Sequence, residues 1–428
     1  MSVSVVILAA GQGTRMKSST PKVLHKICGE YMLYYAVKTA LEISDDVQVV
    51  IYYEAQKVKT ALTDIFGDKC KFVLQDHINF PGTGGAVMAA KPSNDRVIVT
   101  NGDMPLITKA SLEKFLNKNE AVVMSAINLQ NPSGYGRVVT NGDSVIKIVE
   151  EKDASNEQKA IKLVNAGVYS FDKAFLELNL TNLTNNNAQR EYYLTDLVEI
   201  GVNQNSASWT EVDEAEFKGV NSKVDLACAE EIMLERIRNS WMMSGVSMRL
   251  PKTIYIDSAV SFEGECEVES GCVIKGKSKI VNSVIKAGSV VEDAEIINSD
   301  CGPMARIRPK SKILNTHIGN FVECKNARLS GVKAGHLSYL GDCEAGEGTN
   351  VGAGTITCNY DGIRKHETII GKNVFIGSDV QLVAPVIVGD NVLIGAGTTV
   401  TEDIDSGSLA ISRVPQKNIS GFFKKFFA

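Results

Sequence analysis

The sequence lacks the features that mark disulfide-rich, zinc-binding or nucleic-acid-binding proteins. Its nine cysteines are an odd number and form no Cys-x-x-Cys pair, so a disulfide or zinc framework is disfavoured and reduced thiols are expected. Acidic residues outnumber basic ones and the net charge is −5, which disfavours a nucleic-acid partner because such proteins usually carry a basic excess.

Long apolar runs are also absent. No stretch approaches the roughly 20 apolar residues that a membrane-spanning helix needs. The first ten residues lack a basic region and run directly into glycine-rich sequence, so they indicate a first strand and not a signal peptide. We therefore expect a cytoplasmic protein without a transmembrane segment.

What the sequence does contain is, in its first half, an alternation of apolar runs and helical patterns. Two helical patterns cover Tyr31–Glu42 and Ser111–Lys118. The apolar runs are Val3–Ala10, Val47–Tyr53, Lys71–Leu74, Arg96–Asn101 and Ala121–Asn128. The alternation predicts an α/β domain with a mostly parallel, doubly wound sheet, in which ligands bind at the carboxyl ends of the strands.

The character of the sequence changes near Ser222. Ser222 and Asp225 have the spacing of a capping box, and a helical segment follows to about Trp241. With 428 residues, the chain is too long for one ordinary core. We predict a first domain over residues 1–222, a helical linker over 223–247 and a second domain over 248–428.

A six-residue repeat follows in the second half. Weaker examples occur at Ile274/Ile280, at Ile285/Val291/Ile297 and at Ile318/Cys324. The strongest run, without exception, is Ile370, Ile376, Leu382, Val388, Ile394 and Val400. This period fits a β-helix in which each hexad forms one face of a triangular coil, aliphatic residues point inward and small residues take the corners. The period breaks between Thr357 and Ile370, where a polar segment predicts an external loop that is either functional or merely tolerated.

A glycine-rich loop follows the first strand. It contains Gly11-x-Gly13 but neither the third glycine of a Rossmann fingerprint nor the Gly-Lys-Ser/Thr of a P-loop. Its amide groups can cradle phosphates, and Arg15 and Lys22 supply two cations.

These residues belong to longer motifs. The segment LAAGQGTRM followed by PKVLH resembles the signature of the sugar nucleotidyltransferases. The matching segments elsewhere are GTGGA, NGDMPLI, GYGR, IVEEKDA, NNNAQREYYLTD, ARIRP, GNFVECK, KAGHLSYLGD, NVGAGTITCNYDG and AISRVPQ. Together they resemble, over nearly the whole chain, the bifunctional N-acetylglucosamine-1-phosphate uridyltransferase/glucosamine-1-phosphate N-acetyltransferases.

The resemblance implies an N-terminal Rossmann-like domain followed in the chain by a left-handed parallel β-helix. It also implies that the protein catalyses two reactions. Acetyl transfer from acetyl-CoA to glucosamine-1-phosphate is followed by uridyl transfer from UTP, with release of pyrophosphate. The product, UDP-N-acetylglucosamine, is a precursor of peptidoglycan and lipopolysaccharide. The resemblance also implies Mg²⁺ and a homotrimer in which subunits share the acetyltransferase site.

For uridyl transfer, the resemblance implies catalytic roles for Arg15 and Lys22 and metal ligation by Asp103 and Asn221. The residues expected to bind UTP or the UDP-sugar are Leu8, Ala10, Gly11, Lys22, Gln75, Gly82, Thr83, Asn101, Gly136, Glu150, Asn165 and Asn221. Two features depart from the family pattern: the segment DHINFP after Gln75 is longer, and Gly85 stands where a bulkier residue is expected.

For acetyl transfer, His336 is the candidate general base, because an ammonium must lose a proton before it can attack a thioester. Glu323 is expected to orient it. The resemblance implies that Arg308, Lys325, Tyr339 and Asn350 bind glucosamine phosphate. It implies that acetyl-CoA is bound by Ala353, Asn359, Tyr360, Ser378, Ala396 and Arg413.

Two other functions stay open at this point. One is a monofunctional nucleotidyltransferase whose β-helix is only structural, which would need neither His336 nor the Asn359-Tyr360 loop. The other is a regulatory scaffold with an inactive first domain, which would have no need of Arg15, Lys22 and Asp103.

Overall fold

The computed structural model describes residues 2–133, 135–142, 144–149, 151, 154–187 and 189–427. The chain divides into two compact units, Met1–Met233 and Leu234–Ala428. The division falls inside helix α9 (Lys223–Met243), so the extent of a separate linker over residues 223–247 stays a prediction. Reciprocal hydrogen bonds between Ser222 and Asp225 confirm the capping box at the start of this helix.

The first unit is built on one nine-stranded sheet. Its strand order is β5 (Lys71–Leu74), β4 (Asp46–Ile51), β1 (Val3–Leu8), β6 (Arg96–Asn101), β10 (Leu163–Asp172), β7 (Val122–Asn128), β11 (Ala207–Glu211), β9 (Ser144–Val149) and β8 (Arg137–Asn141). The first four strands are parallel, and β10 is antiparallel to both β6 and β7. The predicted strands are therefore present, and the sheet becomes mixed where β10 is inserted.

Helices connect these strands and complete the α/β unit. They are α1 (Met32–Leu41), α2 (Ala55–Phe66), α3 (Gly82–Ala89), α4 (Lys109–Glu113), α5 (Asn156–Lys159), α6 (Lys173–Leu180), α7 (Asp196–Asn203) and α8 (Glu214–Phe217). The carboxyl ends of β1 and β6 lie side by side, because Leu8 pairs with Asn101. The segments that follow these two strands carry the candidate residues of this unit.

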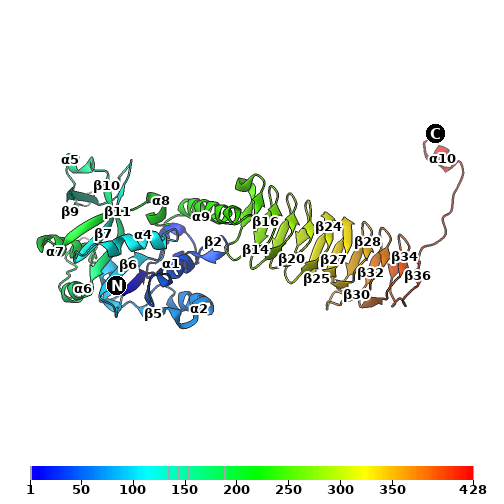
Figure 1. The fold of residues 1–428 in the computed structure, drawn as a ribbon, viewed down its shortest axis with the longest axis horizontal. Coiled ribbons are helices and arrows are strands. Elements are labelled where there is room, and N and C mark those ends of the chain that lie inside the picture. The colour runs from blue at the N-terminus through cyan, green and yellow to red at the C-terminus, as the bar shows by residue number, and fades with distance from the viewer. Residues whose placement is uncertain are drawn as a thin grey trace. The chain divides into compact units, whose positions relative to one another are not determined.

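The second unit is a parallel β-helix with three faces, as the hexad repeat predicted, and Figure 1 shows its coils stacked in sequence order. The first face contains β12 (Ser247–Met248), β15 (Glu267–Val268), β18 (Val284–Ile285), β21 (Asp300–Cys301), β24 (His317–Asn320), β26 (Lys333–His336), β28 (Asn350–Val351), β31 (Phe375–Ile376), β34 (Leu393–Ile394) and β36 (Leu409–Ala410).

The other two faces share two long strands, β25 (Glu323–Ser330) and β27 (Tyr339–Ala345), which turn a corner. The second face adds β13 (Tyr255–Ile256), β16 (Val273–Lys275), β19 (Val290–Glu292), β22 (Arg306–Ile307), β29 (Ile356–Cys358), β32 (Gln381–Val383) and β35 (Thr399–Val400). The third adds β14 (Ser261–Glu263), β17 (Lys279–Val281), β20 (Glu295–Ile297), β23 (Lys312–Leu314), β30 (Thr368–Ile370) and β33 (Val386–Val388).

The six aliphatic residues of the strongest repeat are all buried in the β-helix core, which confirms their predicted inward orientation. One weaker assignment is wrong: Ile297 is only half-buried, whereas Ile296 is fully buried. The reason is register, because Ile280, Ile296 and Ile313 form one inward row and Val281, Ile297 and Leu314 the row beside it. This turn of the coil is one residue shorter than a hexad.

Bulky residues occupy three corners between the first and second faces, where small ones were expected. Met304, Phe321 and Leu337 have φ angles of 58°, 56° and 47°, in the left-handed region that large side chains rarely adopt. All three are more than half exposed.

No helix in the described part of the chain is long and apolar enough to cross a bilayer.

Candidate active sites

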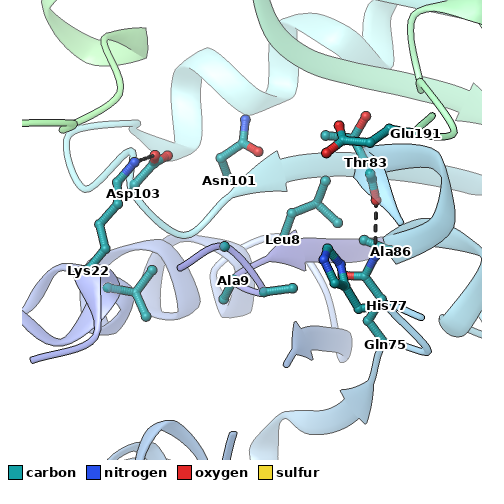
Figure 2. A pocket seen from close by; sticks show the side chains of 14 residues that line it. Leu8, Ala9, Lys22, Gln75, His77, Thr83, Ala86, Asn101, Asp103 and Glu191 are labelled. Carbon is teal, nitrogen blue, oxygen red and sulfur yellow. Dashed lines mark hydrogen bonds and ion pairs between the residues drawn. The ribbon is translucent and has the colours of Figure 1, made fainter. Parts of the chain in front are cut away.

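The carboxyl ends of β1 and β6 open into a cavity of about 280 Å³ in the first unit. It brings together nine of the residues predicted for nucleotide and metal binding: Leu8, Ala10, Gly11, Lys22, Gln75, Gly82, Thr83, Asn101 and Asp103. Figure 2 shows Lys22 and Asp103 at one end of this cavity and Gln75, His77 and Thr83 at the other. The prediction missed Ala9, Val23, His77, Ala86 and Glu191, all of which lie inside or beside the quoted motifs.

Cations and oxygen ligands converge at the Lys22 end. The Lys22 ammonium forms an ion pair with Asp103 and donates to Asn221 Oδ1 at 2.6 Å. The Arg15 guanidinium donates to the same oxygen at 2.8 Å. Asn221 is held beside Asp103 because the Val220 amide donates to the Asp103 carbonyl at 2.9 Å. Four predicted residues from three separate parts of the sequence therefore form one cluster.

A glycine makes this cluster possible. Gly13 has a φ of 64°, and a Cβ there would lie 2.5 Å from the Lys22 Cβ. Any side chain at position 13 would therefore displace Lys22. The glycine-rich loop thus brings a cation close to the backbone that is expected to surround the phosphates.

The same cluster fits a magnesium ion. Asp103 and Asn221 turn oxygen atoms to one point, which the Lys22 ammonium contacts. Mg²⁺ is commonly held by one or two protein oxygens together with substrate phosphates and water. Among the described residues no group of three or more His, Cys, Asp or Glu side chains forms a cage. The donors present thus suit an ion that arrives with a phosphorylated substrate.

A second cavity, of about 260 Å³, adjoins the first. Both are lined by Asn101 and Asp103, and the second also contacts Asn165 and Asn221. Gly136 lies beside it, because its carbonyl accepts from the Asn165 amide at 3.1 Å. Two substrates lying in the two cavities would meet at Asp103. Glu150, also predicted for this site, lies outside the described residues.

The longer segment after Gln75 explains why glycine stands at position 85. The longer segment after Gln75 folds back on itself, and the Phe80 amide donates to the Asp76 carbonyl at 2.8 Å. This brings the Phe80 carbonyl oxygen to 2.0 Å from where a Cβ of residue 85 would lie. Only glycine fits at position 85 beside this loop. Gln75 is 4% exposed, and its amide nitrogen donates to the carbonyls of Phe80 and Gly82 at 3.0 and 3.1 Å.

In the second unit, the candidate acetyl-transfer residues lie along one corner of the β-helix. Backbone hydrogen bonds link the successive turns here: Gly354 donates to Leu337, Asp379 to Ala353, and Gly397 to Ser378. These turns carry, in order, His336, Ala353, Ser378 and Ala396. Arg413 joins the end of this row, because its guanidinium donates to the Ala396 carbonyl at 2.9 Å. His336 is exposed at the corner.

The predicted sugar-phosphate residues flank this corner. Arg308, Lys325 and Tyr339 lie on or at the edge of the second face. Asn350 lies on the first face, paired with Lys333 and Phe375. All predicted acetyltransferase residues thus lie on two adjacent faces, the corner between them and the loop after β29.

Three cations gather on the second face. Lys365, from the loop, lowers the pKa of Lys325, as do burial and the charge of Arg308; Asp342 opposes this shift. Like charges this close favour an anionic ligand between them.

Glu323 does not orient His336 within one chain, contrary to the prediction. Its carboxylate forms an ion pair with Arg308 at 2.7 Å. The physical reason is the coil: Glu323 lies on the second face, in register with Arg306 and Tyr339, whereas His336 ends a strand of the first face.

The predicted external loop follows β29 and is internally braced. The Asn359 side-chain amide donates to Asp342 Oδ2 at 2.5 Å and lies 3.5 Å from the Tyr339 hydroxyl. Asp361 accepts from the amides of Ile363 and Arg364 and contacts His366 at 2.7 Å. Tyr360 is 61% exposed. The loop therefore presents Tyr360 and Lys365 beside the second face from a defined turn.

Both the first and the second half of the chain match known protein families. Residues 5–161 match the MobA-like NTP transferase domain family, and residues 367–402 match the bacterial transferase hexapeptide family (six repeats). The chain is 56% identical over 429 residues to the bifunctional protein GlmU of Wolinella succinogenes, covering 100% of this chain and 99% of that one. It is 57% identical over 426 residues to GlmU of Aliarcobacter butzleri, covering 99% and 98%. With GlmU of Nitratiruptor sp. it shares 57% identity over 428 residues, covering 100% and 99%.

Proposed function

Because this chain belongs to the family of bifunctional GlmU proteins, we propose that it makes UDP-N-acetylglucosamine in two transfer reactions. The observation that carries the proposal is that each unit holds its own set of converging residues. One set surrounds Lys22, Asp103 and Asn221, and the other follows the corner at His336. The product then serves as a precursor for peptidoglycan and lipopolysaccharide.

Acetyl transfer takes place at the corner of the β-helix. His336 removes a proton from the ammonium of glucosamine-1-phosphate, and the free amine attacks the thioester carbonyl of acetyl-CoA. The carbon–sulfur bond breaks, and coenzyme A leaves as its thiol after its sulfur takes up the second proton that the nitrogen loses. Ser378 stabilises the negative oxygen of the tetrahedral intermediate. Arg308, Lys325 and Lys365 hold the phosphate, and their crowding supports this role.

Uridyl transfer takes place where the two cavities of the first unit meet. A phosphate oxygen of N-acetylglucosamine-1-phosphate attacks the α-phosphorus of UTP in line, and pyrophosphate leaves. Arg15 and Lys22 neutralise the triphosphate and the departing pyrophosphate. Gly136, Glu150 and Asn165 hold the sugar.

Gln75 and Thr83 select the base. Both amide protons of Gln75 are engaged by backbone carbonyls, which leaves its oxygen to accept from the N3–H of uracil. Cytosine offers a lone pair at this position, so it is disfavoured.

Magnesium belongs to the uridyl site. We propose Asp103 and Asn221 as its protein ligands, and when bound it neutralises charge on the phosphates. None of the residues predicted to bind substrates at the corner site carries a carboxylate. EDTA or the substitution Asp103→Ala should therefore stop uridyl transfer and leave acetyl transfer intact.

The assembly we propose is a homotrimer. Phe375, Leu393 and Leu409 are neighbours in register on the first face, and each is about half exposed. The exposed Met304, Phe321 and Leu337 extend along the adjoining corner. Apolar surface of this extent favours association, and three copies can close around one axis. Light scattering should give three times the chain mass, and a fully active monomer would contradict the assembly.

The proposal is tested by incubating the pure protein with glucosamine-1-phosphate, acetyl-CoA, UTP and Mg²⁺ and resolving the products by mass. Both N-acetylglucosamine-1-phosphate and UDP-N-acetylglucosamine should appear in that order. A monofunctional nucleotidyltransferase with a structural β-helix would instead use only supplied N-acetylglucosamine-1-phosphate. Formation of neither product would overturn the proposal.

A further inference from the structure

The segment after the last coil differs in charge from the rest of the chain. Residues 414–428 contain Lys417, Lys424 and Lys425 but no Asp or Glu, although the whole chain has a net charge of −5. The same segment exposes Val414 at 87% and Ile419 at 60% of their surfaces. A cationic segment with exposed apolar side chains therefore extends beyond the last strand of the β-helix.

This segment ends in the short helix α10 (Phe422–Phe427), labelled in Figure 1. Phe423 and Phe427 stack at 4.7 Å between ring centroids and are 73% and 75% exposed. Phe422 is 47% exposed, and the Lys425 ammonium lies 6.0 Å from its ring. Three aromatic rings are thus presented to solvent within a single turn and a half of helix.

The helix divides into an aromatic side and a cationic side. At about 100° per residue, Phe422, Phe423 and Phe427 fall within an arc of about 140°. Lys424 and Lys425 fall on the opposite side. Aromatic rings opposite lysines are the arrangement that lies in a bilayer interface, with the rings among the acyl chains and the ammonium groups at the headgroups.

We propose that residues 414–427 bind the surface of an anionic lipid bilayer. The aromatic rings supply apolar area, and the basic residues supply attraction to negative headgroups, which the acid-free composition leaves uncompensated. A neutral bilayer would offer only the first of these contributions, and a protein groove would not require three lysines without a single acid.

The test is sedimentation of the full chain with phosphatidylcholine vesicles that contain or lack one quarter phosphatidylglycerol. The protein should sediment with the anionic vesicles at low salt and be released as salt rises. Lys424→Gln with Lys425→Gln should weaken binding by about 30-fold, from two lost headgroup attractions. Phe423→Ser with Phe427→Ser should weaken it by at least about tenfold at unchanged charge.

A matched control is Lys59→Gln with Lys69→Gln, which removes two exposed lysines from the first unit. It should bind vesicles like the unaltered protein. Equal sedimentation with neutral and anionic vesicles would overturn the proposal, and so would equal loss in the control. A third contrary result is that the two Phe→Ser changes alter the oligomeric state in vesicle-free buffer, because the segment would then dock on another copy of the chain.

Discussion

At the scale of single residues, the role that we propose for His336 as the general base of acetyl transfer can be tested directly. The substrate amine is mostly protonated near neutral pH, and an ammonium cannot attack a thioester. His336→Ala should reduce acetyl transfer by about 10²–10⁴-fold, as expected for loss of a general base. Raising the pH should restore part of the rate, because more amine is then free. Steady-state assays across pH measure both effects.

The control for this variant is its other reaction. Uridyl transfer from supplied N-acetylglucosamine-1-phosphate should stay close to that of the unaltered protein. If His336→Ala retained most acetyl transfer at pH 7, the base would have to be another residue, and Tyr339 is the next candidate.

The protonation of Lys325 should change when the sugar phosphate binds. Lys365, burial and Arg308 lower the pKa of Lys325, so its ammonium releases a proton more readily than an ordinary lysine. A bound phosphate stabilises the ammonium and raises this pKa again. When the pH is near this lowered pKa, binding should therefore take up protons, and affinity should fall as the pH rises through it. Calorimetry in buffers of different ionisation enthalpy measures the uptake.

Lys325→Met should abolish this proton uptake, whereas Lys59→Met in the first unit should not change it. Uptake that persists in Lys325→Met would assign the proton to another group.

Which residues could be predicted follows from what determines each position. Lys22 and Asp103 lie in the motifs PKVLH and NGDMPLI, and the structure brings them together with Asn221. The partner of Glu323 depends on which face of the coil each residue occupies, and residue type does not reveal that. The need for Gly85 depends on the path of the Phe80 carbonyl, so it became visible only with the folded loop.

At the scale of the elements, the coil register predicts a sharp contrast between two adjacent residues. Ile296 points into the β-helix core, and Ile297 belongs to the row beside it. Ile296→Ala should lower the free energy of unfolding by about 2–5 kcal/mol through the lost side chain and the cavity. Ile297→Ala should lower it by less than about 1 kcal/mol.

Denaturant titrations of the two variants provide the measurement, with each serving as the control of the other. A larger effect for Ile297→Ala would restore the register that the simple hexad pattern predicted.

Periodicity predicted the elements better than the details of their pairing. The strongest hexads are regular because each inward residue follows the last by six, so their orientation was predictable. A shorter turn breaks this spacing near Ile296. A strict six-residue pattern then assigns the next residue, Ile297, to the core. The sequence pattern also does not predict that β10 is inserted antiparallel between β6 and β7, because the direction of this strand depends on long-range pairing.

At the scale of the whole molecule, two reactions on one chain can be separated genetically. The Asp103 cluster lies in the unit Met1–Met233, and the His336 corner lies in the unit Leu234–Ala428. Asp103→Ala should make N-acetylglucosamine-1-phosphate but no UDP-sugar, and His336→Ala should be nearly unable to start from glucosamine-1-phosphate.

Mixing the two variants should restore UDP-N-acetylglucosamine synthesis. The acetylated sugar phosphate is a small, soluble intermediate, so one variant can release it and the other can use it. After mixing, product should appear with a lag that shortens as the concentration of the Asp103→Ala variant increases, because that variant supplies the intermediate. A chain carrying both substitutions should stay inactive at any concentration and serves as the control. If the mixture stayed as inactive as the double variant, the intermediate would have to pass between sites without leaving the protein, and independent action of the two units would be wrong.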